Sequence, residues 1–334
     1  MSVKLAINGF GRIGRSVLRA AIETRRSDIK IIAINDLGPV ETIAHLLQYD
    51  SVHGRFPETV HFSNNSLNIG QSDIKVTAMR DPAQLPWQNI DVVLECTGNF
   101  TTRDQAAIHL ENGARQVLVS APSKGADKTI VYGVNHDQLT GTDRVVSNAS
   151  CTTNCLSPIA QVLNQTIGIK RGFMTTIHSY TGDQPLLDTM HKDLYRARSA
   201  ASSMIPTSTG AAKAVGVVLP ELAGKLDGVS IRVPTPNVSC VDLTFETSRA
   251  TSVNEINESI TAAAEGALKN VIGVTDHKLV SIDFNHNPLS SIFATDQTKV
   301  IDGSFCRVLI WYDNEWGFSN RMLDTSLYMA QTCI

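Results

Sequence analysis

Apolar and polar positions near the start of the chain fall into two alternating patterns. A short apolar run ending at Ile7 predicts a buried strand, and a second run over 31–34 predicts another. Between them, Val17, Leu18 and residues 20–22 recur at helical spacing. The segment therefore predicts strand, turn, helix and strand in succession.

The same arrangement continues to about residue 149. Runs over 91–96 and 116–120 are short and apolar and end in small or polar residues, with a helix-like stretch between them. We expect parallel strands whose carboxyl ends line a crevice. This part of the chain predicts a Rossmann-type α/β domain.

The pattern changes after residue 150. Apolar positions at helical spacing follow Cys151, and runs over 172–180, 229–233, 240–245 and 305–311 predict strands of a largely antiparallel sheet with long excursions. Helical spacing returns from Trp316 onwards and predicts a last helix that packs back on the first domain. We therefore predict a Rossmann-type domain over 1–149, an α+β domain over 150–314, and a returning helix over 315–334.

Composition narrows the class of protein. The chain has 334 residues, 42% hydrophobic and 18% charged, as in globular proteins, which excludes a disordered or fibrous chain. The net charge of −3 is spread along the sequence, so there is no general bias toward nucleic acid or an anionic membrane. No apolar run reaches membrane-spanning length and the N-terminus lacks a signal-peptide pattern, so we expect a cytoplasmic protein without membrane partners.

Six cysteines are too few for a disulfide framework in a chain of this length. Cys151 and Cys155 are spaced Cys-x3-Cys, but no further Cys or His lies near them in sequence. A structural zinc site needs four ligands, so this spacing is a weak zinc signal and we expect no metal.

The turn after the first strand carries the motif G-x-G-x-x-G, formed by Gly9, Gly11 and Gly14. In a strand–turn–helix setting these glycines permit a tight turn, a close approach to a pyrophosphate, and close packing of helix on strand. Asp36 ends the next strand, where a carboxylate accepts from a ribose 2′-hydroxyl and repels a 2′-phosphate. This favours NAD over NADP. The alternative is a glycine turn that binds nothing. The strand, the helix and Asp36 all occur at the spacing expected for a dinucleotide-binding unit, which argues against this alternative.

Three further residues are candidates for the same crevice. Thr97 and Ser120 follow predicted strands and would lie at the nicotinamide end, although small residues also simply end strands. Arg80 is ambiguous, because an exposed arginine is common in any protein.

The segment 147–155, SNASCTTNC, places a thiol where a strand turns into a helix. Ser150 is the predicted N-cap and Cys151 a first-turn residue. Free backbone N–H groups and the helix dipole favour the thiolate there, which is the reactive form. The alternative is a small buried apolar cysteine, and these residues alone leave both interpretations open.

Six runs spread over the chain carry a family resemblance: INGFGRIGR, SNASCTTNC, the Thr-Ile-His segment, STGAAKAVG, RVPTPNVS and WYDNEWG. The sequence resembles the phosphorylating glyceraldehyde-3-phosphate dehydrogenases from Val3 to the C-terminal helix. The resemblance implies oxidation of D-glyceraldehyde 3-phosphate with NAD and inorganic phosphate to 1,3-bisphosphoglycerate, by a homotetramer.

The resemblance also assigns roles to residues. Cys151 would be the nucleophile and His178 its activating partner, forming an ion pair with the thiolate and then acting as base. Arg198 lies two residues from Arg196 and could replace it as the anion ligand. Contacts implied for the attacking phosphate are Ser150, Thr152, Thr209 and Gly210, those for the substrate phosphate are Thr181, Arg196 and Arg232, and those for NAD include Arg12, Ile13, Arg80 and Asn314.

Two other functions are conceivable. Erythrose-4-phosphate dehydrogenases resemble the chain around Cys151, but the 179–184 loop and the 208–213 turn follow the glyceraldehyde-3-phosphate type. RNA or receptor binding has no support, because basic residues are dispersed without interleaved aromatics. Two further predictions are local: Pro158 bends but does not break its helix, and Asp183 orients the loop near His178 and Thr181.

Overall fold

The computed structural model describes residues 2–70 and 72–332 and divides into two compact units. Unit 1 comprises the chain up to residue 130, residues 136–149 and residues from 319 on, and unit 2 comprises 131–135 and 150–318. The ends of the predicted ranges 1–149 and 315–334, at residues 1 and 333–334, lie outside the described residues, as does Cys333.

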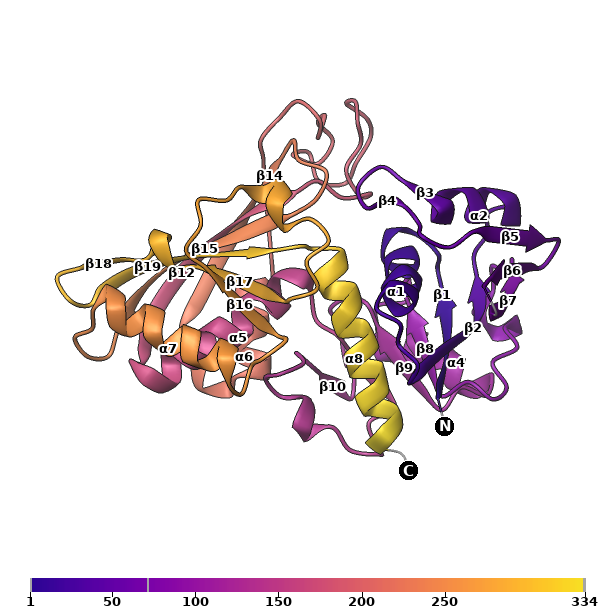
Figure 1. Cartoon of the computed structure of the whole chain (residues 1–334), viewed down its shortest axis with the longest axis horizontal. Helices are drawn as coiled ribbons and strands as arrows, with labels where there is room; N and C mark the ends of the chain where they lie inside the picture. The colour runs from indigo at the N-terminus through magenta and orange to yellow at the C-terminus, as the bar shows by residue number, and fades with distance from the viewer. Residues whose placement is uncertain (1, 71, 333–334) are drawn as a thin grey trace. The chain divides into compact units, whose positions relative to one another are not determined.

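Unit 1 is built on a twisted, mostly parallel sheet with flanking helices (Figure 1). The strand order is β10-β11-β9-β8-β1-β2-β7-β6-β5, parallel from β10 to β7 and antiparallel for the last two pairings. Its strands are β1 (Val3–Asn8), β2 (Ile29–Asn35), β5 (Val60–Ser63), β6 (Ser66–Ile69), β7 (Ser72–Thr77), β8 (Val92–Glu95), β9 (Gln116–Val119), β10 (Lys128–Thr129) and β11 (Val145–Ser147), with the small hairpin β3 (Tyr49–Asp50) and β4 (Gly54–Arg55) beside them. Its helices are α1 (Arg12–Glu23), α2 (Val40–Gln48), α3 (Arg103–Ala106) and α4 (Ile108–Glu111).

The central strands of this sheet are buried on both faces. Leu5 and Ile7 in β1, Val93 in β8 and Val117 in β9 have no exposed surface. Such continuous apolar burial is what a parallel sheet covered by helices requires. The predicted Rossmann-type fold is confirmed, with the strands expected at 31–34, 91–96 and 116–120 present as β2, β8 and β9.

The last helix, α8 (Trp316–Thr332), contributes its residues from 319 on to unit 1. Asp324 receives a hydrogen bond of 2.7 Å from Arg26, just after the end of α1, and Thr325 donates one of 3.0 Å to the Asn148 side chain. These contacts join α8 to the segment after α1 and to Asn148, which both belong to unit 1.

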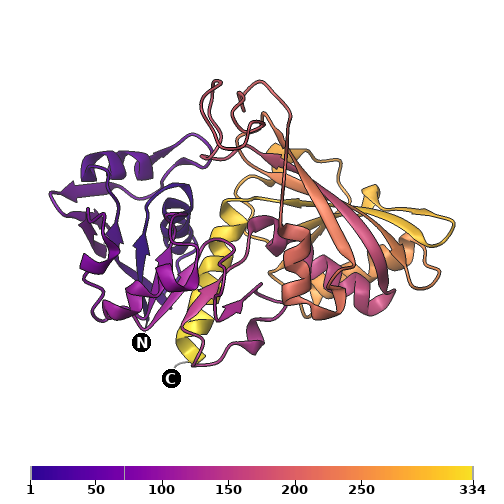
Figure 2. The same ribbon diagram turned by 180° about the vertical axis from the view of Figure 1, so that it is seen from behind.

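Unit 2 is a sheet in the order β13-β14-β12-β15-β19-β17-β16, with β18 also paired to β19. All pairings are antiparallel except β12 with β14 and β16 with β17, which confirms the largely antiparallel sheet. Three helices, α5, α6 and α7, cover one face (Figures 1 and 2). The bounds are β12 (Ile169–Ser179), β13 (Ile205–Thr207), β14 (Leu226–Val233), β15 (Ser239–Thr247), β16 (Ile272–Thr275), β17 (Ser291–Ala294), β18 (Lys299–Ile301), β19 (Phe305–Tyr312), α5 (Cys151–Thr166), α6 (Ala211–Val218) and α7 (Val253–Glu265).

Helix α5 runs through Pro158, so the helix does not break there, as predicted. Pro158 is buried, and the apolar side chains that follow it, Ile159, Ala160 and Leu163, have no exposed surface. Packing of this face against the sheet therefore offsets the hydrogen bond that proline removes. Within residues 2–70 and 72–332, the helices are all too short or too polar to span a bilayer.

Candidate active site

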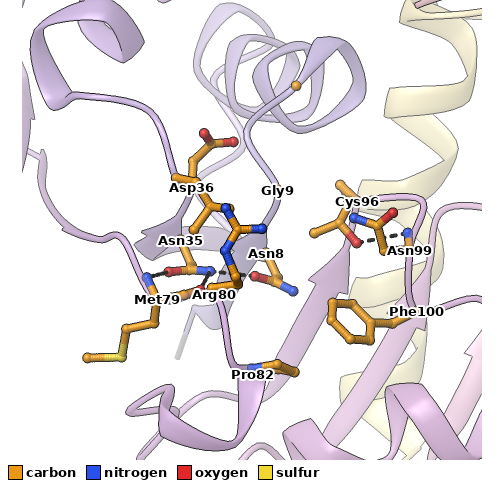
Figure 3. A pocket seen from close by; sticks show the side chains of 13 residues that line it. Asn8, Gly9, Asn35, Asp36, Met79, Arg80, Pro82, Cys96, Asn99 and Phe100 are labelled. Atoms are coloured by element: carbon orange, nitrogen blue, oxygen red, sulfur yellow. Dashed lines mark hydrogen bonds between the residues drawn. The ribbon is translucent and has the colours of Figure 1, made fainter. Parts of the chain in front are cut away.

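A cavity of about 450 Å³ lies at the carboxyl ends of β1, β2 and β8 in unit 1 (Figure 3). Open parallel sheets bind their ligands at this edge. The predicted cofactor residues Gly9, Gly11, Asp36, Arg80 and Thr97 line it. Arg12, Ile13, Gly14 and Ser120 are not among its lining residues, and Asn314 belongs to unit 2.

The glycine turn forms a cradle that a dinucleotide fits. A Cβ added at Gly9, where φ is +90°, would lie 2.6 Å from Thr97 N, and one added at Gly14 would lie 2.2 Å from Gly9 O. At Gly11 an added Cβ would meet no described atom within 4 Å. Gly9 and Gly14 therefore permit close packing, while Gly11, the N-cap of α1, leaves space at the helix N-terminus for a phosphate.

Asp36 is fixed in place by backbone groups. Its Oδ2 accepts from Phe10 N at 2.7 Å and its Oδ1 accepts from Gly38 N at 2.9 Å. A carboxylate held at the end of β2 suits a ribose hydroxyl and repels a 2′-phosphate. Arg12, by contrast, forms a 2.5 Å ion pair with Asp50, which ties α1 to the β3–β4 hairpin.

The candidate nucleophile is the first residue of α5 in unit 2. Ser150 caps the helix, because its Oγ accepts from Thr153 N at 3.1 Å. This confirms the predicted cap and places Cys151, which is partly exposed, beside unpaired N–H groups of the first turn.

His178 near the end of β12 faces the thiol. Its Nε2 lies 3.5 Å from Cys151 Sγ, and its Nδ1 lies 2.7 Å from the carbonyl oxygen of Ser179. The tautomer whose Nδ1–H donates to this carbonyl leaves Nε2 unprotonated toward the thiol, whereas the tautomer whose Nδ1 accepts from Arg232 Nη1, 2.7 Å away, carries its proton on Nε2. The Tyr312 ring packs edge-on against the imidazole, with centroids 5.9 Å apart.

Burial opposes charge on both partners. It raises the pKa of the Cys151 thiol, against the lowering effects of Arg232 and of hydrogen bonds from Thr152 and the helix backbone. Burial and then the Arg232 charge lower the pKa of His178 to about 3, against the Ser179 carbonyl. Desolvation therefore favours neutral thiol and imidazole, the opposite of the ion pair that the resemblance implies.

Arg232 on β14 is the register partner of His178. Its Nη1 lies 2.7 Å from His178 Nδ1 and donates to Ser179 O at 3.0 Å, while its buried Nε has no hydrogen-bond partner among the described residues. A buried guanidinium with an unused donor is suited to an anion.

The two candidate arginines of the long loop differ. Arg196, with 21% of its side chain exposed, pairs with Asp183 and Asp193, and its charge lowers the pKa of both His178 and Arg232. Arg198 is 66% exposed and pairs with Asp188. Arg196, and not Arg198, therefore belongs to the electrostatic environment of His178 and Arg232, where it adds to the effect of burial.

The predicted hydroxyl ligands divide into two groups. Thr152 Oγ1 lies 2.9 Å from the Tyr312 hydroxyl, which is also 2.9 Å from Thr176 Oγ1. Thr152 therefore lies in the buried hydrogen-bond network beside His178. Thr209 accepts from Ala211 N at 3.2 Å next to Gly210, the N-cap of α6. Thr181 lies in a turn, where its carbonyl accepts from Gln184 N. Among the described residues, no hydrogen bond joins Thr181 or Thr209 to Cys151.

Asn314 is held by residues that sequence reasoning missed. Its Oδ1 accepts from Ser179 Oγ at 2.9 Å and from Ser239 Oγ at 2.8 Å. Both hydroxyls fix the amide so that its NH₂ group is the end left for a ligand. The available signal was a serine at a buried position of an apolar strand, where a polar side chain needs a partner.

Comparison with known proteins agrees with this geometry. Residues 3–103 match the family model "Glyceraldehyde 3-phosphate dehydrogenase, NAD binding domain", and residues 150–314 match "Glyceraldehyde 3-phosphate dehydrogenase, C-terminal domain". The chain is 68% identical over 333 residues to a glyceraldehyde-3-phosphate dehydrogenase of Xanthobacter flavus and 67% identical over 331 residues to one of Cereibacter sphaeroides, with 99% of each chain covered. It is 54% identical to one of Geobacillus stearothermophilus at the same coverage. The chain therefore belongs to the glyceraldehyde-3-phosphate dehydrogenase family.

Proposed function

We propose that the protein oxidises D-glyceraldehyde 3-phosphate, with NAD and inorganic phosphate, to 1,3-bisphosphoglycerate and NADH. The observation that carries the proposal is the thiol of Cys151 at the start of α5, 3.5 Å from Nε2 of His178 and beside Arg232. The matching family models and relatives support the same reaction.

The first step activates the nucleophile. In the tautomer whose Nδ1–H donates to the Ser179 carbonyl, His178 Nε2 takes the thiol proton, and that carbonyl holds the resulting imidazolium in place. The sulfur then adds to the aldehyde carbon and forms a C–S bond, while the carbonyl π pair moves onto oxygen. The backbone N–H of Cys151 at the helix start stabilises this oxyanion, and the imidazolium returns its proton to it.

Oxidation of this hemithioacetal gives a thioester. His178 removes the hydroxyl proton while the hydride leaves the carbon, and the carbon–oxygen double bond forms again. NAD, when bound by the glycine turn and Asp36 of unit 1, supplies the hydride acceptor. A phosphate oxygen then attacks the thioester carbon and the C–S bond breaks. The acyl phosphate is released as product, and Cys151 is left as the thiolate.

Two anions need ligands in this reaction. We assign the attacking phosphate to the hydroxyls and backbone near two helix N-termini, and the substrate phosphate to Thr181, Arg196 and Arg232. The unused Nε of Arg232 and the position of Arg196 support the second assignment over one that uses Arg198. The ligands of the attacking phosphate are Ser150, Thr152, Thr209 and Gly210.

The cavity supports five of the cofactor contacts, because Gly9, Gly11, Asp36, Arg80 and Thr97 line it. We assign the pyrophosphate to the glycine turn (Gly9, Gly11, Arg12, Ile13 and Gly14), the adenosine half to Asp36 and Arg80, and the nicotinamide end to Thr97, Ser120 and Asn314. The division into an NAD-binding part over 1–149 with 315–334, and a catalytic part over 150–314, is part of this proposal.

We also propose that the protein is a homotetramer of the cytoplasm. Large apolar side chains are exposed on the long loop, where Leu187 is 78%, Met190 97% and Leu194 82% exposed. Phe173 and Ile301 on the sheet of unit 2 are 50% and 57% exposed. Exposed apolar groups of this extent suit contacts with further copies. The described cysteines are free, which fits a reducing compartment.

The test is NADH formation followed by absorbance, with D-glyceraldehyde 3-phosphate or erythrose 4-phosphate, NAD or NADP, and phosphate present or absent. We expect phosphate-dependent turnover of the triose with NAD, lost in Cys151→Ser. Preference for erythrose 4-phosphate, or turnover that does not need phosphate, would contradict the substrate and phosphate assignments.

A further inference from the structure

A row of four polar side chains, three buried and one partly buried, crosses the sheet of unit 1 at the cofactor cavity. Asn8, Asn35, Thr77 and Glu95 are the last residues of β1, β2, β7 and β8, and they are register partners in these neighbouring parallel strands. None of them takes part in the chemistry at Cys151. Four adjacent strands thus end in side chains that can reach one another across the sheet.

The hydrogen bonds along this row are continuous. Asn8 Nδ2 donates to Glu95 Oε2 at 2.6 Å, Asn35 Nδ2 donates to Asn8 Oδ1 at 2.9 Å, and Thr77 Oγ1 donates to Asn35 Oδ1 at 2.9 Å. Asn35 also exchanges two 2.9 Å hydrogen bonds with the backbone of Met79, just before Arg80 (Figure 3). The row therefore links the end of β8 to the segment that carries Arg80.

The charge of Glu95 follows from its partners. The Trp87 indole can only donate, and it donates to His109 Nδ1 at 2.9 Å, so the imidazole proton lies on Nε2, 2.9 Å from Glu95 Oε2. Thr97 N and Thr97 Oγ1 donate to Glu95 Oε1 at 2.9 and 2.5 Å. Four donors converge on Glu95, which is 1% exposed, so it is a carboxylate and His109 is neutral.

Glu95 determines the shape of the cavity through Thr97. The Thr97 hydroxyl donates a hydrogen bond to Glu95 and accepts one from Asn99 N at 3.1 Å, which fixes the turn over 97–99. The backbone of this turn packs directly against Gly9. Six of the residues that line the cavity belong to the row, are hydrogen-bonded to it or lie next to it. They are Asn8, Gly9, Asn35, Met79, Thr97 and Asn99.

We propose that Glu95 is a positioning residue for NAD: a buried anion, held by His109 and Trp87, that fixes the floor of the dinucleotide cavity without touching the cofactor. The row holds the ends of the four strands at the spacing that the cofactor needs. Loss of the carboxylate then weakens NAD binding and leaves the thiol of unit 2 unchanged. The inference rests on NAD binding by unit 1, which titration of the wild-type protein tests first.

The test is Glu95→Gln, studied in the whole protein. The glutamine amide has the same shape, but only its oxygen can accept, and its NH₂ group then faces donors. The variant therefore loses either the hydrogen bonds from Asn8 and His109 or those from Thr97. We expect the dissociation constant for NAD, measured by calorimetry, to rise about tenfold, the effect of losing a hydrogen bond to a charged group. The rate at which iodoacetamide alkylates Cys151 without NAD should stay within a factor of about two.

Glu111→Gln is the matched control, because it removes the same charge from an exposed position of α4 in the same unit and should leave NAD affinity unchanged. Circular dichroism establishes that each variant is folded at the temperature of the titration. If Glu95→Gln does not fold, Glu95→Asp decides: it keeps the charge but retracts the carboxylate, and we expect a smaller loss of affinity. A folded Glu95→Gln, or in its place Glu95→Asp, that binds NAD like the wild type would overturn the proposal.

Discussion

Two buried histidines, one in each unit, show how differently the same side chain is used. His109 has no exposed surface, and each ring nitrogen has one partner of the matching kind: it accepts from Trp87 and donates to Glu95. His178 is 4% exposed, and its Nδ1 faces a carbonyl and a guanidinium, both at 2.7 Å, while Nε2 faces a thiol.

The difference separates positioning from chemistry. At His109 every donor meets an acceptor, so one arrangement of protons is strongly preferred and the side chains are fixed. At His178 a proton can lie on sulfur or on nitrogen. Burial raises the pKa of Cys151 and lowers that of His178, and the charge of the neighbouring Arg232 acts to lower both. A proton that can move between two atoms is what thiol activation requires.

The largest expected effect is that of His178→Asn. Without the base, the thiol proton has no acceptor at 3.5 Å, and we expect kcat/KM for the triose phosphate to fall about 10³-fold, within the usual range for a general base. NAD affinity should remain at the wild-type value, because the cavity of unit 1 is unchanged. Steady-state kinetics and calorimetry measure the two quantities, and near-normal turnover would refute the assigned role.

His109→Ala should act on stability instead. The change leaves the Trp87 indole and one position of the Glu95 carboxylate without their buried partner. We expect a loss of about 3 kcal/mol in the free energy of unfolding, as when one member of a buried ion or hydrogen-bonded pair is removed. Urea unfolding measures it, and the alkylation rate of Cys151 in the folded variant should not change.

Arg232→Met tests the electrostatics at the thiol. Arg232 lowers the pKa of Cys151 and of His178, so its removal raises both: the thiolate fraction at a given pH falls, and the His178 pKa moves up from about 3. The alkylation profile should therefore move to higher pH, and the reaction at pH 7 should slow by about tenfold if the thiol pKa rises by about one. Arg198→Met, at an exposed position, is the control. A profile that does not move would mean that Arg232 has no influence on the thiol.

The smallest effect is expected for Asp183→Asn. Asp183 is 52% exposed and pairs with Arg196 and His191, so we predict that it orients the loop through a partly solvated interaction. We expect about a twofold rise in KM for the triose phosphate with kcat unchanged. Unchanged kinetics would mean that Asp183 does not orient the loop for the substrate.

Features that depend on a few adjacent residues were predictable from the sequence. A hydroxyl before a helical pattern identified Ser150 as the cap and Cys151 as a first-turn residue, and the glycine turn with Asp36 identified the cofactor edge. The contacts of Glu95 were not predictable. His109 lies 14 residues from Glu95 and 22 from Trp87, and Asn314 lies 75 from Ser239, so only tertiary structure joins them. The spacing of apolar residues predicts helices and strands, but it does not indicate which distant residue a single buried polar side chain contacts.

The most direct test of this division measures two quantities in two variants. We would determine the NAD dissociation constant and the Cys151 alkylation rate for Glu95→Gln and for His178→Asn. We predict crossed results: Glu95→Gln weakens NAD binding and leaves alkylation unchanged, while His178→Asn slows alkylation and leaves NAD binding unchanged. If either variant in its folded form changed both quantities to a similar extent, positioning and chemistry would not be separate, and the central claim would be wrong.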